Sequence, residues 1–172
     1  MHMTTDKLIC DFSTPHCLDW YSVDDVVMGG ASGSRFYRNP DSTGTFEGTL
    51  STENGGGFAS VRTFLPDRDF SAYAGIRLRV RGDGKRYSFR IRNDDRFDGI
   101  VYKSDFDTIP DVWMEFLLPF SEFKAAFRGR TVDGTHPIDA SNIVQIGILV
   151  SKKQVGPFTL DIDWIKACVA GK

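Results

Sequence analysis

Residues 75–92, GIRLRVRGDGKRYSFRIR, contain two strand-like runs joined by an Asp-Gly turn. Apolar and polar residues alternate in Gly75–Arg81 and again in Arg86–Asn93, which is the pattern of a half-buried β-strand. Asp-Gly between two such runs favours a hairpin with a two-residue turn, and this turn would fix the pairing of the strands. The pairs expected on the inner face of this hairpin are Ile76 with Ile91, Leu78 with Phe89, and Val80 with Tyr87.

The same register places arginines opposite one another on the outer face of the hairpin. Opposed like charges are unfavourable, so acidic groups, a phosphate or a partner's carboxylates should neutralise them. Asp161, Asp163 or Glu115 could do this as ordinary surface ion pairs. The functional alternative is a binding face for anions. Its candidate residues are Arg62, Arg77, Arg79, Arg90, Arg92 and Tyr102.

Working outward, eight further runs have strand character, and one short segment has helical character. Ser121 can cap a helical turn over Ser121–Phe127. No strand–helix–strand rhythm is present, which argues against a parallel nucleotide-binding sheet. The sequence therefore predicts an all-β antiparallel sandwich with one short helix, as a single domain over residues 1–172. The further strands are Leu8–Phe12, Ser34–Tyr37, Thr45–Leu50, Phe58–Phe64, Ile100–Phe106, Val112–Leu118, Ile143–Ser151 and Phe158–Ala167. The expected core residues are Phe12, Phe46, Phe58, Val61, Ile76, Leu78, Val80, Phe89, Ile91, Phe116, Leu118, Ile146, Ile148, Leu160, Ile162 and Trp164.

Composition limits the class of partner and the compartment. The chain has 21 Lys and Arg against 23 Asp and Glu, so its net charge of −2 gives no overall attraction to nucleic acid or to an anionic membrane. The three cysteines form no Cys-x-x-Cys pair, and a reducing compartment fits them best. No signal peptide, transit peptide or transmembrane span is recognisable, so a cytoplasmic protein is expected.

Two glycine-containing loops are candidate functional segments. The first follows Trp20 and carries adjacent carboxylates before a Gly-Gly turn. Paired carboxylates could act as acid and base or bind calcium, but Asp before such a turn usually hydrogen-bonds its own backbone, so no metal, cofactor or catalytic residue is assigned. The second, Glu53–Phe58, lacks the Gly-Lys-Ser/Thr of a P-loop and is expected to be a hairpin turn between Thr45–Leu50 and Phe58–Phe64. The candidate residues of the first loop are Trp20, Asp24, Asp25, Met28, Gly29 and Gly30.

Several ordered motifs between about Phe12 and Ile165 resemble those of one known family. They include Trp20–Ser32 with its core Asp25–Gly30, then Gly55–Arg62, Tyr73–Ile76 and Arg81–Lys85, followed by Trp113, Leu118–Phe120, Phe123, Arg128–Arg130, Ile146–Gly147 and Gln154–Phe158. Together they resemble the 30 kDa complex I intermediate-associated protein family, whose domain belongs to the galactose-binding-like jelly-roll class. Val26 stands where the family usually has the first glycine of Asp-Gly-Val-Met-Gly-Gly, so the detail of that turn is not carried over.

The resemblance implies a chaperone-like factor that holds membrane-arm intermediates of respiratory complex I, and here a bacterial or cytosolic relative. The favoured hypothesis is a non-catalytic protein-binding or assembly module, which holds an acidic or extended partner segment on the arginine face and the Asp24–Ser32 loop. The alternative is a carbohydrate-binding module with Trp20, Tyr21, Tyr102 or Trp113 as a sugar platform, although Trp113 alternates as a core residue. A glycosidase-like carboxylate pair is a third possibility, for which no residues are nominated.

Overall fold

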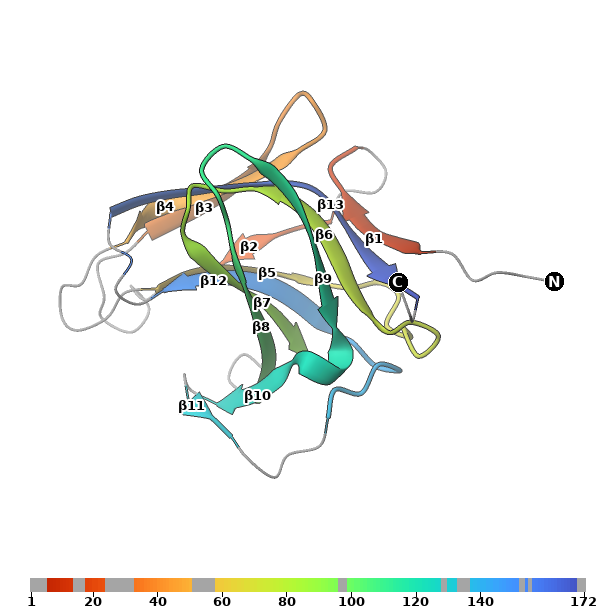
Figure 1. The fold of residues 1–172 in the computed structure, drawn as a ribbon. Coiled ribbons are helices and arrows are strands. Elements are labelled where there is room, and N and C mark those ends of the chain that lie inside the picture. Colours follow the sequence, from red (N-terminus) through yellow and green to blue (C-terminus); the bar gives the residue numbers. More distant parts are fainter. Residues whose placement is uncertain are drawn as a thin grey trace.

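The computed structural model describes residues 6–13, 18–23, 33–50, 58–95, 99–127, 130–132, 137–151, 154 and 156–169. Within these residues, thirteen strands form two sheets, and all strand pairs in the two sheets are antiparallel (Figure 1). All ten predicted strands are present. The predicted antiparallel β-sandwich is therefore confirmed.

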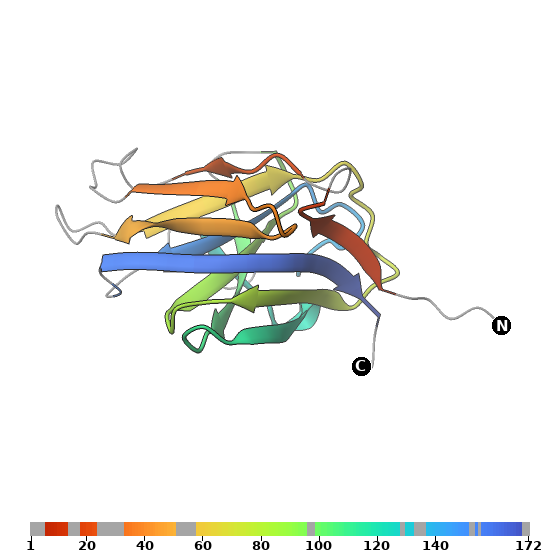
Figure 2. The same ribbon diagram turned by 90° about the horizontal axis from the view of Figure 1, so that it is seen from above.

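One sheet has six strands and is built around the last strand of the chain. Its order is β3-β4-β13-β6-β9, and β1 also pairs with β13. β4 pairs with the first half of β13 and β1 with its second half, while β6 runs along the other side (Figure 2). The strands are β1 (Lys7–Asp11), β3 (Gly33–Arg38), β4 (Gly44–Leu50), β6 (Gly75–Arg81), β9 (Trp113–Pro119) and β13 (Gly156–Cys168).

The other sheet has seven strands in the order β11-β10-β8-β7-β12-β5-β2. Its inner face carries apolar residues at alternate positions, such as Phe89 and Ile91 of β7 and Ile146 and Ile148 of β12, and these are almost fully buried. The strands are β2 (Tyr21–Ser22), β5 (Phe58–Phe64), β7 (Arg86–Arg92), β8 (Val101–Asp107), β10 (Lys124–Phe127), β11 (Arg130–Thr131) and β12 (Gln145–Ser151).

The predicted hairpin is wrong, because β6 and β7 belong to different sheets. β6 pairs with β13 and β9, whereas β7 pairs with β12 and β8. Alternation predicts only that each strand has one apolar face. That face can be buried equally well when the two strands are neighbours in one sheet and when they lie in opposite sheets. The hairpin predicted around the second glycine loop is wrong for the same reason, since β4 and β5 also lie in different sheets; residues 51–57 lie outside the described part of the chain.

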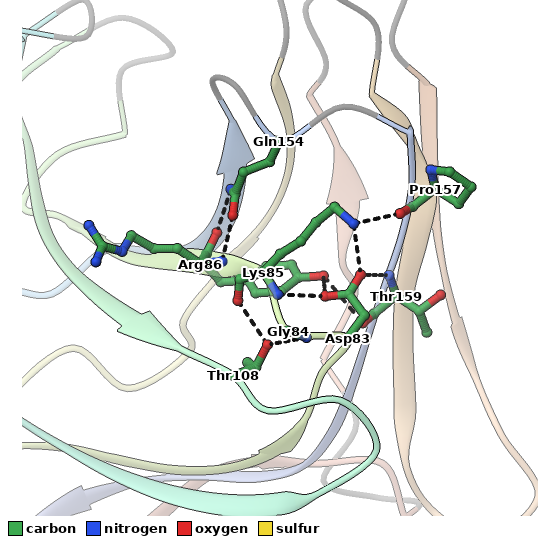
Figure 3. A network of polar contacts seen from close by, with 9 residues as sticks. Asp83, Gly84, Lys85, Arg86, Thr108, Gln154, Pro157 and Thr159 are labelled. Carbon is green, nitrogen blue, oxygen red and sulfur yellow. Dashed lines mark hydrogen bonds and ion pairs between the residues drawn. The ribbon is translucent and has the colours of Figure 1, made fainter.

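Asp83 organises the turn that carries the chain from one sheet to the other (Figure 3). Its carboxylate accepts hydrogen bonds from the backbone N–H groups of Lys85 (3.2 Å) and Thr159 (2.9 Å) and from the hydroxyl of Tyr87 (3.0 Å). Gly84, at φ +93°, donates its N–H to Thr108 Oγ1 at 3.0 Å. The Asp-Gly dipeptide therefore predicts a turn correctly. This turn connects the two sheets at the end of the sandwich and is held by side-chain hydrogen bonds.

Tyr87 should make the folded protein lose stability as the pH becomes alkaline. Burial, followed by the Asp83 carboxylate, raises the pKa of Tyr87 well above its ordinary value of 10.0. The unfolded chain ionises this tyrosine near pH 10 and the folded chain does not, so its stabilisation is complete below pH 10 and is lost as the pH rises further. Urea unfolding from pH 8 to 11 should show the wild type losing up to about 1.4 kcal/mol per pH unit relative to Tyr87→Phe. Parallel pH curves would contradict this assignment.

The predicted core is buried except at Phe58, Phe116 and Trp164, which are half-buried. Trp164 was expected inside because it continues the alternation of Leu160 and Ile162. A β-bulge shifts the pairing of β13 with β6 between Ile162 and Trp164, so Ile165 takes the buried position. Trp164 instead lies beneath the Lys166 ammonium, 4.3 Å from its ring centroid.

The short helix is smaller than predicted. It is a single 3-10 turn, Phe120–Glu122, without a side-chain cap. Residues from Lys124 continue as β10, which pairs with β8 and buries Ala125 and Ala126. Sheet pairing with β8 therefore overrides the local helical pattern.

Candidate functional site

The arginines of β6 lie on the outer face of the six-stranded sheet and have carboxylate partners. Arg77 is 3.3 Å from Asp6, Arg79 is 3.2 Å from Asp163 and 3.8 Å from Glu115, and Arg81 is 2.8 Å from Asp161. Arg79 and Arg81 also lie over the ring of Trp113, at 5.1 and 4.9 Å from its centroid. These arginines therefore form ordinary surface ion pairs, which was the simpler of the two interpretations of the sequence. Trp113 lies among them on the outer face and is not a core residue.

The single arginine face predicted from the sequence is therefore divided between opposite sides of the sandwich. Arg77 and Arg79 belong to the six-stranded sheet, whereas Arg62, Arg90 and Arg92 belong to the seven-stranded sheet. Tyr102 does not join either group, because it pairs with Ile91 on the inner face and packs into the core. Arg92 is 8% exposed and donates to the carbonyl of Gly99 at 3.2 Å, so it supports the fold.

A row of residues crosses the outer face of the seven-stranded sheet at one register. The β-pairings connect each member of this row to the next across neighbouring strands. Four of its six members are basic, and they are separated by one glycine near the middle. We call this set the cation row, and its members are Lys124 (β10), Lys103 (β8), Arg90 (β7), Gly147 (β12), Arg62 (β5) and Tyr21 (β2).

Gly147 leaves a pit between Arg62 and Arg90. A Cβ at this position would lie 2.6 Å from the backbone oxygen of Val61, which is too close for any side chain to fit without moving the strand. The pit measures about 20 Å³, room for about one water molecule. A small polar group of a ligand can therefore approach the backbone between two guanidinium groups.

Arg90 is a cation of the row with a buried donor that has no partner among the described residues. Its Nε is buried and has no hydrogen-bond partner, and the guanidinium forms no ion pair within 4.0 Å among the described residues. Burial lowers the pKa of Arg90 from its ordinary value to about 10, with Asp105 opposing this change and Arg62 adding to it. A buried charge without a partner is costly, and an anionic group of a ligand would relieve that cost.

A second, wider hollow of about 360 Å³ adjoins Arg90 on the side away from Arg62. Its lining includes Ser88, Lys103, Asp105 and Leu149. Ser88 is buried, and its hydroxyl has no hydrogen-bond partner among the residues described. The pit and this hollow share Arg90 and Leu149 in their linings, so they adjoin across the middle strands of the sheet, and we call the two together the depression.

An exposed aromatic pair lies beyond Arg62, at the β2 edge of the same sheet. The rings of Tyr21 and Phe64 are stacked with centroids 6.1 Å apart, and they are 39% and 44% exposed. The Tyr21 hydroxyl donates to Gln145 Oε1 at 3.3 Å, which fixes the orientation of the ring. This pair offers a flat apolar surface next to the cation row.

The loop predicted to carry Asp24, Asp25, Met28, Gly29 and Gly30 lies outside the described residues. Trp20, which precedes it, stacks on Phe36 at 5.2 Å and packs against the core, so this ring is not an open platform. Among the described residues, no cluster of three His, Cys, Asp or Glu side chains is arranged to hold a metal ion. The described part of the chain also contains no helix long and apolar enough to span a membrane.

Sequence comparison connects this fold and its motifs to a known family. The family model described as "Complex I intermediate-associated protein 30 (CIA30)" matches residues 10–162. The chain belongs to the CIA30 family. The resemblance noted from its sequence motifs is thereby confirmed.

Several eukaryotic proteins are relatives of this CIA30 chain. It is 34% identical to an uncharacterized protein of Schizosaccharomyces pombe, over 88% of this chain and 78% of that protein. It is 29% identical to the mouse mitochondrial complex I intermediate-associated protein 30 and 25% identical to the Drosophila protein of that name, over 95% and 92% of this chain. It spans only 56% and 61% of the length of these two proteins.

These relatives correct two expectations. The cytoplasmic location predicted from the sequence is wrong, because the mouse and fly proteins are named as mitochondrial. The expected bacterial relationship is not supported either, since these relatives are eukaryotic.

Solved structures show the same fold at low sequence identity. A family 11 carbohydrate-binding module from Clostridium thermocellum, in complex with a β-1,3-1,4-mixed-linked tetrasaccharide, has a TM-score of 0.71 and 20% identity over 98% of both chains. An agarase, AgWH50C, has a TM-score of 0.66 and 13% identity, over 98% of this chain and 25% of the enzyme. These structures share the jelly-roll sandwich fold that was predicted for the CIA30 chain.

Proposed function

We propose that this chain is a single, non-catalytic protein-binding domain that acts as an assembly factor on intermediates of respiratory complex I in mitochondria. Membership of the CIA30 family and the names of the mouse and fly relatives support this role. The partner binds on the outer face of the seven-stranded sheet, along the cation row. The predicted loop Asp24–Ser32 remains a second candidate contact.

The observation that carries this choice of face is the contrast between the two sheets. Arg77, Arg79 and Arg81 are each within 3.3 Å of a carboxylate on the outer face of the six-stranded sheet. Arg90, in a depression on the opposite face, has no such partner among the described residues. A surface that already satisfies its charges gains little from a partner, whereas an unpaired, half-buried cation gains a charge-assisted hydrogen bond.

A matched pair of double variants tests this face. Affinity pull-downs from mitochondrial extract should recover complex I subunits with the wild type and at least about ten-fold less with Arg62→Gln/Arg90→Gln. Arg77→Gln/Arg79→Gln removes the same charge from the opposite face and should recover wild-type amounts. Melting temperatures of all three proteins control for unfolding. Equal losses in both double variants, or no loss in either, would contradict the proposed face.

Carbohydrate binding is the second candidate, favoured by the exposed Tyr21–Phe64 pair beside the depression. Stacked aromatic rings suit the apolar face of a sugar ring. Binding of mixed-linkage β-glucan by the wild type and not by Tyr21→Ala, together with an empty pull-down, would favour this candidate over the assembly role.

A further inference from the structure

Two unsatisfied donors lie side by side on the outer face of β7. Ser88 and Arg90 are two residues apart in this strand, so their side chains project from the same face. The Ser88 hydroxyl and the Arg90 Nε are both buried without a hydrogen-bond partner among the described residues. Buried polar groups are almost always hydrogen-bonded, so a pair of orphan donors aimed into one depression indicates an absent acceptor.

The surroundings of these donors favour an anionic acceptor. Lys103 lies directly opposite Arg90 on β8 and lines the same hollow. Asp105, opposite Ser88, also lines this hollow, but it is exposed and is not among the ion pairs formed within 4.0 Å by the described residues. A carboxylate can accept hydrogen bonds from a hydroxyl and a guanidinium together, and it would also be held by the nearby ammonium.

The cation row favours a ligand with several anionic groups rather than one. From Lys124 to Arg62 the row crosses four strand-to-strand steps, which amounts to roughly 19 Å at about 4.8 Å per step. An extended peptide of about six residues has the same length. The stacked aromatic pair lies beyond Arg62, so the centre of the row offers hydrogen-bond donors and positive charge and no ring on which a sugar could stack.

We infer that the partner contributes an extended acidic peptide segment, which crosses the strands of the seven-stranded sheet and places one carboxylate on Ser88 and Arg90. This inference rests on the proposed protein-binding function and names the chemistry of the partner. Lys103, Lys124 and Arg62 attract the flanking acidic side chains. The pit at Gly147 leaves room for one small polar group of the segment between the two arginines.

Fluorescence anisotropy with labelled ten-residue peptides tests this assignment. A peptide of alternating Glu and Ser should bind the wild-type protein at low salt and be released as salt rises, while the matching Gln and Ser peptide should not bind. Ser88→Ala and Arg90→Met should each weaken binding of the Glu peptide by about ten-fold or more. Arg79→Gln, on the opposite face, should bind it like the wild type. Arg90→Met removes a desolvated charge, so its melting temperature should stay the same or rise.

The possible outcomes separate this inference from the proposed function. Equal binding of the Glu and Gln peptides, or wild-type affinity of Ser88→Ala, would overturn the carboxylate pocket. Alginate, an acidic polysaccharide, would replace the acidic peptide as ligand if it alone bound with the same dependence on Ser88 and Arg90. The Ser88→Ala variant is also used in the pull-down. Complex I subunits recovered equally with Ser88→Ala and the wild type would overturn the pocket and keep the assembly role, whereas their absence from the wild-type pull-down would overturn the assembly role itself.

Discussion

Replacement of Asp83 by alanine should lower the free energy of unfolding by about 3 kcal/mol. The carboxylate accepts two backbone N–H groups and the hydroxyl of Tyr87, whose phenol ring is fully buried. Its removal leaves these donors without that acceptor at the crossing between the sheets. Urea unfolding monitored by tryptophan fluorescence measures the loss.

Asp107→Ala is the control for this variant. Asp107 forms an ion pair with Arg86 at 2.7 Å, and its side chain is 67% exposed. An exposed pair of this kind contributes little, so the control should unfold close to the wild type. Similar losses in the two variants would show that the Asp83 network is no more than a surface interaction.

Substitution of Gly147 by valine should have a comparable effect, about 3 kcal/mol of destabilisation, by overpacking. The Cβ would lie 2.6 Å from the carbonyl oxygen of Val61 on the paired strand β5, and a backbone atom in the middle of a sheet cannot move aside as a surface side chain can. Thermal unfolding followed by circular dichroism measures the change.

Leu149→Val serves as the matched control, because Leu149 lies two residues further along β12 on the same outer face and is half-buried. It should melt within a few degrees of the wild type. A Gly147→Val protein as stable as this control would mean that β12 and β5 lie further apart than the structure shows.

Local pattern was sufficient to locate the ten predicted strands, because each has an apolar face and ends at turn residues. It could not assign strands to sheets. The runs around Asp83 satisfy the alternation rule equally well as a hairpin or as strands in opposite layers, so Arg77 and Arg90 were placed on one face although they lie on opposite sides. Trp164 was misplaced because one bulge residue reverses the faces of everything that follows it.

The candidate site was recovered only in part. Arg62 and Arg90 were identified as residues of a binding face, and their part in binding remains a prediction. Ser88, Gly147, Lys103 and Lys124 were missed, since their proximity to Arg90 depends on pairings among β7, β8, β10 and β12 that no local pattern encodes. The position of Ser88 two residues before Arg90 in an alternating strand was the one signal available in the sequence.

β13 lies at the centre of its sheet, and this position determines when the sheet can fold during synthesis of the chain. β4 pairs with β3 on one edge and β6 pairs with β9 on one edge, but the two strands do not pair with each other, and Gly156–Cys168 joins these two halves of the sheet. Until the ribosome has released those residues, the two strands have unsatisfied edges that could pair with other chains. Folding of this sheet must therefore be completed after nearly all of residues 1–172 have been synthesised, and a chain truncated before β13 should aggregate instead of forming half a sandwich.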